Sequence, residues 1–240
     1  MSPAVSTPRM VAHGLVALAL TALACAVLAS WGSPQPSTAV TVVAVLSGTA
    51  FLGAFLAGLS QRRPRHYGPA DTITLVRAAL AAVCTCWMVL TVAGVLPPQS
   101  WWLLATSVTA LVLDGVDGAI ARRTGSASTS GGRLDAETDA ALILVLSVVA
   151  AHVVGWWVLL GGLMRYLFLL GQWLRPRWRA PLPYSQARRT VAATQGGILA
   201  GITGPVVPVW LAVLAGGVGL ALLLWSFTRD VLVLEAGGRG

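Results

Sequence analysis

The chain has 240 residues, of which 56% are hydrophobic and only 10% are charged, and its mean hydropathy is +0.78. Because a soluble domain carries about 25% charged residues, this composition excludes an ordinary soluble protein and indicates a polytopic helical membrane protein. The net charge of +8 comes from arginine alone. These arginines lie at the ends of apolar segments, so they indicate membrane topology and phosphate binding rather than a nucleic-acid partner.

Apolar segments long enough to cross a bilayer, about twenty residues each, recur along the chain. They are continuous rather than alternating, which favours helices over the strands of a membrane barrel. We therefore predict an all-α fold with eight transmembrane helices. They cover about residues 10–31, 38–60, 70–96, 101–122, 133–154, 155–174 and 188–204, and the eighth ends at Phe227.

The first of these helices, at residues 10–31, is longer than the apolar core of a signal peptide and is followed at once by a second apolar segment. We predict that it is retained in the membrane, with a removable signal peptide as the alternative. The chain then divides into an N-terminal pair of helices with a basic loop, residues 1–68, and a membrane domain, residues 69–240.

The arginines gather at alternate ends of the predicted helices. They occur at Arg9, 62–65, 122–133, 175–189 and Arg229, whereas the loops near residues 35, 98, 155 and 204 have none. With eight membrane crossings, all these clusters lie on one side, which the positive-inside rule assigns to the cytoplasm. We predict a multi-pass protein of the cell membrane with both termini and the acidic motif described next on the cytoplasmic side.

Five of the eight acidic residues fall between residues 114 and 139. Two sets of residues there recur at helical spacing, and each set lies on one face of its helix. The sets are Asp114, Asp117, Gly118, Ala121 and Arg122, and then Gly131, Asp135 and Asp139. Two such helices can direct four carboxylates at one point, and these cannot all stay ionised without a compensating positive charge. Oxygen ligands suit Mg²⁺ or Mn²⁺, so the pattern predicts a site for one or two of these ions.

These eight positions resemble the signature of the CDP-alcohol phosphotransferases, Asp-x2-Asp-Gly-x2-Ala-Arg-x8-Gly-x3-Asp-x3-Asp, and every fixed position matches. The resemblance implies six core helices around a polar, cytoplasm-facing cavity, preceded here by two additional helices, and a homodimer. It also implies transfer of a phosphatidyl or other substituted phosphoryl group from a CDP-linked donor to an alcohol, with release of CMP. The expected donor is CDP-diacylglycerol, and the acceptors that fit are glycerol 3-phosphate, an inositol phosphate or another alcohol.

The resemblance also implies a function for each motif residue. The metal ligands are Asp114, Asp117, Asp135 and Asp139, and two ions are expected. Asp139 shares the second metal site and acts as general base on the acceptor hydroxyl. Gly118 and Ala121 are small, which lets the nucleotide approach the helix backbone. Arg122 is placed to contact donor phosphate oxygens, and Gly131 eases entry into the following helix.

A looser match lies at the start of the third predicted helix. Asp71, Thr74 and Arg77 resemble the family's Asn-x2-Thr-x2-Arg box, which lines the nucleotide pocket. Asp71 stands where asparagine is usual, so this residue either contacts the nucleotide or only caps the helix.

Three further arginines are candidates for anion binding. Arg165 lies near the middle of its predicted helix, where an arginine is costly unless it faces a polar cavity. We favour a cavity-facing position that binds an acceptor phosphate; a structural ion pair or a snorkelling side chain is the alternative. Arg188 and Arg189 stand where phosphatidylglycerolphosphate synthases carry Gly-Lys-x-Lys-Thr, and either anion binding or a topogenic charge pair explains them.

Two other functions stay open. A divalent cation channel or transporter would also need acidic residues, but near the middle of a path through the membrane rather than at one face. A non-catalytic member of the family would not need an intact motif. Only the enzyme releases CMP, so this product separates the enzyme from the transporter, and the intact motif argues against the non-catalytic member.

Overall fold

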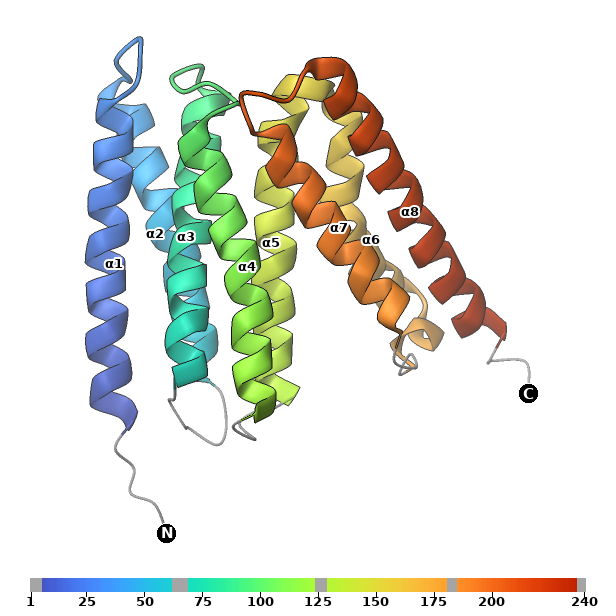
Figure 1. Ribbon diagram of the computed structural model, residues 1–240. Helices are drawn as coiled ribbons and strands as arrows, with labels where there is room; N and C mark the ends of the chain where they lie inside the picture. Colours follow the sequence, from blue (N-terminus) through green and yellow to red (C-terminus); the bar gives the residue numbers. More distant parts are fainter. Residues whose placement is uncertain (1–5, 62–68, 124–128, 181–184, 237–240) are drawn as a thin grey trace.

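The computed structural model describes residues 6–61, 69–123, 129–180 and 185–236, and every regular element in these ranges is a helix. The elements are α1 (Ser6–Ser30), α2 (Thr38–Ser60), α3 (Pro69–Val92), α4 (Trp101–Arg123), α5 (Thr129–Val154), η1 (Trp156–Val158), α6 (Leu159–Leu174), η2 (Pro176–Arg179), α7 (Gln186–Ile202) and α8 (Val209–Ala236). The helices run up and down side by side, and α1 begins at the same end of the bundle where α8 ends (Figure 1). The predicted all-α fold is confirmed.

Six helices of the described chain are long and apolar enough to span a membrane, which is typical of a multi-pass membrane protein. These spans are Pro8–Ser30, Thr38–Ser60, Asp71–Val92, Leu134–Val154, Trp156–Leu174 and Val209–Glu235. The remaining long helices are α4, whose apolar part Trp101–Val116 is shorter, and α7, which is 17 residues long and begins with polar residues. The charged residues that the sequence marks as functional lie in the second half of α4 and in the first turn of α7, so the polar site shortens the apolar part of each helix.

Some helix ends differ from the sequence prediction. The helix α8 continues nine residues past Phe227, because Arg229 and Asp230 have polar partners and do not end it. The helix α3 ends at Val92 rather than near residue 96, and the chain turns at Gly94, whose φ of 72° favours glycine. The helix α5 begins at Thr129, four residues before the predicted start.

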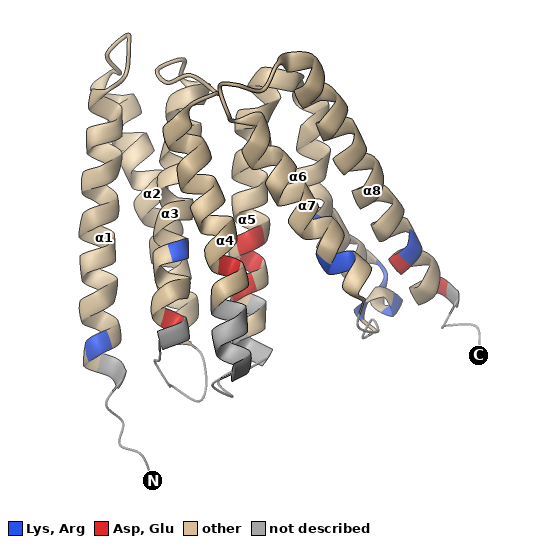
Figure 2. Cartoon of the chain, viewed as in Figure 1, with Lys and Arg blue, Asp and Glu red and all other residues tan. Residues whose placement is uncertain are grey.

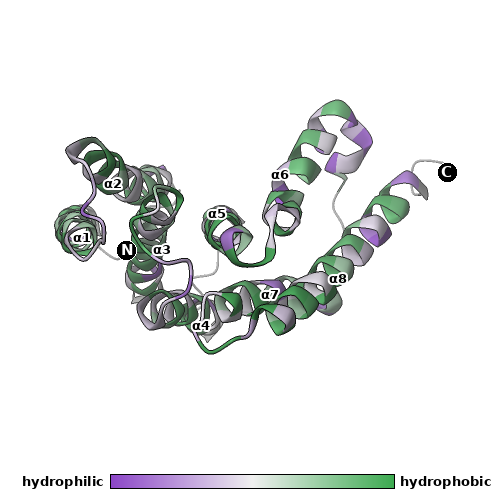
Figure 3. Ribbon diagram, turned by 90° about the horizontal axis from the view of Figure 1, so that it is seen from above, coloured by the Kyte–Doolittle hydropathy of each residue, from purple (hydrophilic) through white to green (hydrophobic). Residues whose placement is uncertain are grey.

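The packing places α5 in the middle of the molecule. Seen from above, α3, α4, α7 and α8 follow one another in an arc, with α5 and α6 on its inner side (Figure 3). The helix α5 packs against α3, α6, α7 and α8, while α1 and α2 pack against α3. The main core is formed by apolar side chains such as Leu90, Leu103, Leu146 and Leu199, all 1% exposed or less. This arrangement holds the helices that carry the acidic motif, α4 and α5, between the arginine-bearing helices α3 and α7.

The charged residues of the described chain lie in one half of the bundle, the lower half in Figure 2. The opposite end, with the α1–α2, α3–α4 and α7–α8 loops, carries no charged residue in the sequence. There the loops are joined by neutral contacts: Gln99 Nε2 donates to the carbonyls of Ile202 and Gly204, each at 3.1 Å. The one-sided distribution of arginine that the sequence predicts is therefore present in the fold.

Candidate functional site

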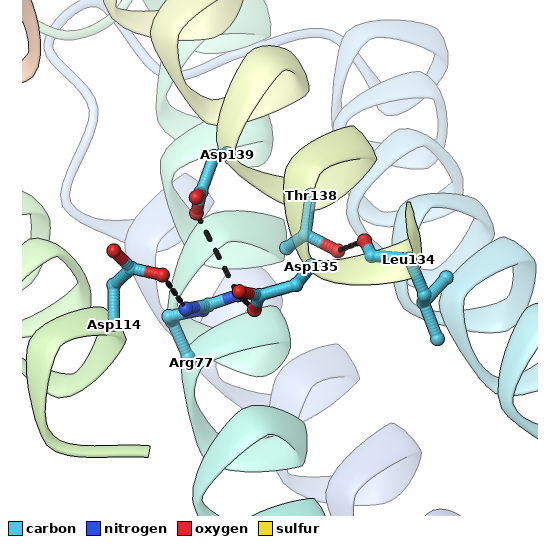
Figure 4. Close-up of polar contacts among 6 residues, drawn as sticks. All are labelled: Arg77, Asp114, Leu134, Asp135, Thr138 and Asp139. Carbon is cyan, nitrogen blue, oxygen red and sulfur yellow. Dashed lines mark hydrogen bonds and ion pairs between the residues drawn. The ribbon is translucent and has the colours of Figure 1, made fainter. Parts of the chain in front are cut away.

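Three carboxylates of the acidic motif converge between α4 and α5 (Figure 4). Asp135 and Asp139 are four residues apart and therefore lie one above the other on α5. Asp114 approaches from α4, and one oxygen of each carboxylate lies within 4.8 Å of the others. Each side chain is about a third exposed, at 37%, 35% and 34% for Asp114, Asp135 and Asp139. The cluster is thus half-buried but still open to a ligand.

The guanidinium of Arg77 lies among these carboxylates. It comes from α3, is 1% exposed, and donates through Nη1 to Asp114 Oδ1 and through Nη2 to Asp135 Oδ1. The distance from Arg77 Nη2 to Asp139 Oδ1 is 3.6 Å. The planar fork of an arginine suits this bridging position, because it offers several donors in fixed directions. Arg77 therefore holds the carboxylates of two helices together.

The charge of this cluster fits a divalent metal ion. Three negative carboxylates and one positive guanidinium leave two negative charges when all four groups are ionised. Carboxylate oxygens are the ligands that Mg²⁺ and Mn²⁺ prefer. The group Asp114, Asp135 and Asp139 is accordingly able to bind a metal ion, as the sequence predicts.

Several residues of the predicted site lie outside the described side chains. They are Asp117, Gly118, Ala121 and Arg122 on α4 and Gly131 on α5, whose backbones are helical. Metal binding by Asp117, the nucleotide approach at Gly118 and Ala121, and the donor phosphate contact of Arg122 therefore stay predictions.

A cavity of ≈ 350 Å³ adjoins the acidic cluster, between α5, α6, α7 and α8. Its polar lining consists of Asp139, Arg165, Arg188, Gln195, Ser226 and Asp230. Of the three clustered carboxylates, Asp139 alone lines this cavity as well. A molecule bound in the cavity would therefore meet the acidic cluster at Asp139.

The comparison with protein families agrees with this geometry. The family model described as CDP-alcohol phosphatidyltransferase matches residues 67–229, about two thirds of the chain. The chain belongs to the CDP-alcohol phosphatidyltransferase family. No curated protein and no solved structure matches it. The matched region begins just before α3, so α1 and α2 precede the CDP-alcohol phosphatidyltransferase domain.

The box predicted to line the nucleotide pocket of a CDP-alcohol phosphatidyltransferase lies in the first three turns of α3. Asp71 is in the first turn and half-buried, and Thr74 is 7% exposed. Arg77 follows on α3 but points into the acidic cluster (Figure 4). The structure thus adds a function for Arg77, as a counter-charge to the carboxylates, while the predicted nucleotide contacts stay predictions.

Two of the three further arginines that the sequence marks for anion binding line the cavity. Arg165 lines the cavity, and its Nη2 lies 2.5 Å from Glu137 Oε1. Arg188 also lines it, and its Nη1 lies 3.2 Å from Asp230 Oδ2. Arg189 is exposed on α7 and does not line this cavity. Arg165 thus makes an ion pair and also lines the cavity, while its binding of an acceptor phosphate stays a prediction.

Four polar residues of this region are not among those predicted from the sequence. They are Glu137, Gln195, Ser226 and Asp230. Asp230 was missed because the eighth helix was predicted to end before it. Gln195 had a recognisable signal, since it is a lone amide in the apolar second half of its helix. Glu137 had none, because its partner Arg165 lies on another helix, and Ser226 had none, because only the packing of α8 brings it to the cavity.

Proposed function

We propose that this protein transfers a phosphatidyl group from CDP-diacylglycerol to an alcohol and releases CMP. The membership in the CDP-alcohol phosphatidyltransferase family supports the reaction class. The observation that carries the proposal is the position of Asp139, which belongs to both the carboxylate cluster and the cavity lining. A donor pyrophosphate at the cluster and an acceptor in the cavity would meet at this residue.

The reaction forms one P–O bond, breaks another and moves one proton. An acceptor oxygen attacks the phosphorus of the phosphatidyl group, and the bond from that phosphorus to the bridging pyrophosphate oxygen breaks, so that CMP leaves. Asp139 is the proposed general base that takes the proton of the attacking hydroxyl. Asp114 and Asp135, oriented by Arg77, would hold the donor end of the site in a fixed geometry.

Divalent metal ions are the proposed cofactor, held by Asp114, Asp117, Asp135 and Asp139. Mg²⁺ or Mn²⁺ would neutralise the charge of the pyrophosphate and stabilise the leaving phosphate. The three carboxylates of the described cluster, with one oxygen of each within 4.8 Å of the others, support this assignment. They would otherwise repel the phosphates of the donor.

The arginines at the cavity support an anionic acceptor such as glycerol 3-phosphate or an inositol phosphate. The Nε of Arg165 is buried and has no hydrogen-bond partner among the described residues, although Nη2 is paired with Glu137. A buried donor without a partner is unfavourable unless a ligand supplies the acceptor atom. An acceptor phosphate is the group that an arginine binds best.

The proposed function is tested by a screen of acceptors. The purified protein is given CDP-diacylglycerol, Mg²⁺ and one of glycerol 3-phosphate, an inositol phosphate, inositol or serine, and both CMP and the lipid product are measured. We expect release of CMP that depends on one acceptor, with a lipid of the corresponding mass. Absence of CMP with every acceptor, together with Mg²⁺ flux in protein-containing vesicles, would instead identify a cation transporter.

Replacement of Arg165 by alanine is expected to raise the acceptor KM about 10- to 100-fold, the usual cost of losing a charge-assisted hydrogen bond. The donor KM should change little, because Arg165 lies on the cavity side of Asp139. Arg175→Ala is the matched control, since Arg175 is 66% exposed and does not line the cavity. Equal effects of Arg165→Ala on both substrates would favour a purely structural ion pair with Glu137.

We further propose that the protein is a homodimer of the cell membrane and that the charged end of the bundle faces the cytoplasm. Two exposed glutamines flank α2 and allow a matched test of this orientation, Gln35 at the uncharged end and Gln61 at the charged end. The cysteine of Gln61→Cys should react with a membrane-impermeant thiol reagent only from the cytoplasmic side, and that of Gln35→Cys only from outside. The three native cysteines are buried and should stay unlabelled. The reverse labelling pattern would invert the proposed topology.

A further inference from the structure

The side chain of Gln195 is buried in the bundle without a polar partner. It lies on the inner face of α7 and is 1% exposed. Neither Nε2 nor Oε1 has a hydrogen-bond partner among the described residues. Burial of an amide that makes no hydrogen bond disfavours the folded state. Gln195 therefore does not stabilise the bundle through the contacts of its amide.

The neighbouring helices leave room for this amide by means of two glycines. A Cβ atom at Gly161 of α6 would lie 2.5 Å from Gln195 Nε2, and one at Gly219 of α8 would lie 2.5 Å from Gln195 Oε1. Even an alanine at either position would displace the amide. The bundle thus accommodates a polar group that it does not pair, which is the arrangement expected of a binding residue.

The amide lies at the cavity that contains the proposed general base. Gln195 lines the cavity together with Asp139, Arg165 and Arg188. An amide offers two donor hydrogens and a carbonyl oxygen, and a hydroxyl group is both a donor and an acceptor. A ligand hydroxyl bound here would form hydrogen bonds with the amide. The guanidinium groups of Arg165 and Arg188 are suited to binding an anionic group of the same ligand.

We infer that Gln195 binds a hydroxyl group of the acceptor other than the hydroxyl that attacks. This inference rests on the proposed function and narrows it. The acceptor is then a polyol phosphate: its phosphate lies toward the arginines, one hydroxyl toward Asp139 and a second toward Gln195. Gln195 is a specificity residue, because a site that hydrogen-bonds a substrate hydroxyl discriminates against an analogue lacking it.

The test uses Gln195→Met, which keeps the length of the side chain and removes the amide. We expect its thermal unfolding midpoint to equal or exceed that of the wild type, because no hydrogen bond of the fold is lost. The KM for the polyol phosphate should rise about 10- to 100-fold while the KM for CDP-diacylglycerol stays unchanged. Gln186→Met, the same change at an exposed position of α7, is the control and should alter neither value.

Comparing an acceptor with an analogue that lacks one hydroxyl tests whether the change in KM comes from the second hydroxyl. Glycerol 3-phosphate is compared with 3-hydroxypropyl phosphate, which lacks only the middle hydroxyl, and an inositol phosphate is compared with its singly deoxygenated analogues. The wild type should prefer the complete acceptor about 10- to 100-fold in kcat/KM, and Gln195→Met should lose this preference.

Each other outcome contradicts the inference. An unchanged preference in Gln195→Met, an equal loss with both members of a pair, or a variant that fails to fold would show that the amide is structural or is satisfied by water. Turnover confined to an alcohol with a single hydroxyl would overturn the inference and leave the proposed function intact. Absence of CMP release by the wild type with every acceptor would overturn both.

Discussion

Asp139→Asn is expected to slow the chemical step about 10²–10⁴-fold, the usual contribution of a general base. The substitution keeps the size of the side chain and one oxygen but removes the site that would take the proton. Binding of CDP-diacylglycerol should weaken far less, because Asp114 and Asp135 remain in place with Arg77 between them. Single-turnover CMP release measures the first effect, and donor binding without acceptor measures the second.

Two further variants separate the general base from a metal ligand. Asp114→Asn should lower metal affinity and donor binding together. Glu235→Gln makes the same carboxylate-to-amide change on α8, where Glu235 accepts a hydrogen bond from Trp178 Nε1 at 2.8 Å, and should leave turnover unchanged. Near-normal turnover of Asp139→Asn would refute the base assignment. Loss of donor binding as complete as in Asp114→Asn would leave Asp139 as a metal ligand only.

Removal of divalent metal by EDTA is expected to abolish CMP release, and Mg²⁺ or Mn²⁺ should restore it. The physical reason is the net charge of the described cluster, which is negative without the metal and would repel a pyrophosphate. The same experiment has a readout that does not depend on activity. A ligand that binds only the folded protein stabilises it by about 2.7 kcal/mol at a concentration of 100 Kd.

Thermal unfolding of the wild type should therefore shift upward with Mg²⁺. The shift should be lost in Asp114→Asn and kept in Glu235→Gln, whose carboxylate lies outside the cluster. Full turnover in metal-free buffer would exclude the proposed cofactor. Turnover that needs metal, without any shift in unfolding, would place the metal on the donor nucleotide rather than on the protein.

The sequence by itself determined the fold class, the family and the position of the acidic motif. Membrane helices are recognisable because each must contain about twenty apolar residues whatever its neighbours are. The motif is recognisable because a helix brings residues three and four apart to one face, as it does for Asp135 and Asp139. The prediction that these carboxylates need a compensating charge followed from the same spacing.

Only the tertiary structure decided which residues from other helices complete the site. It placed Arg77 of α3 between the carboxylates of α4 and α5. It also brought Glu137 to Arg165 and left the amide of Gln195 at a cavity beside Asp139. No spacing rule predicts these contacts, because they depend on how helices pack and not on the period within one helix. The end of α8 depends on such contacts too, since Asp230 stays in the helix where Arg188 of α7 reaches it.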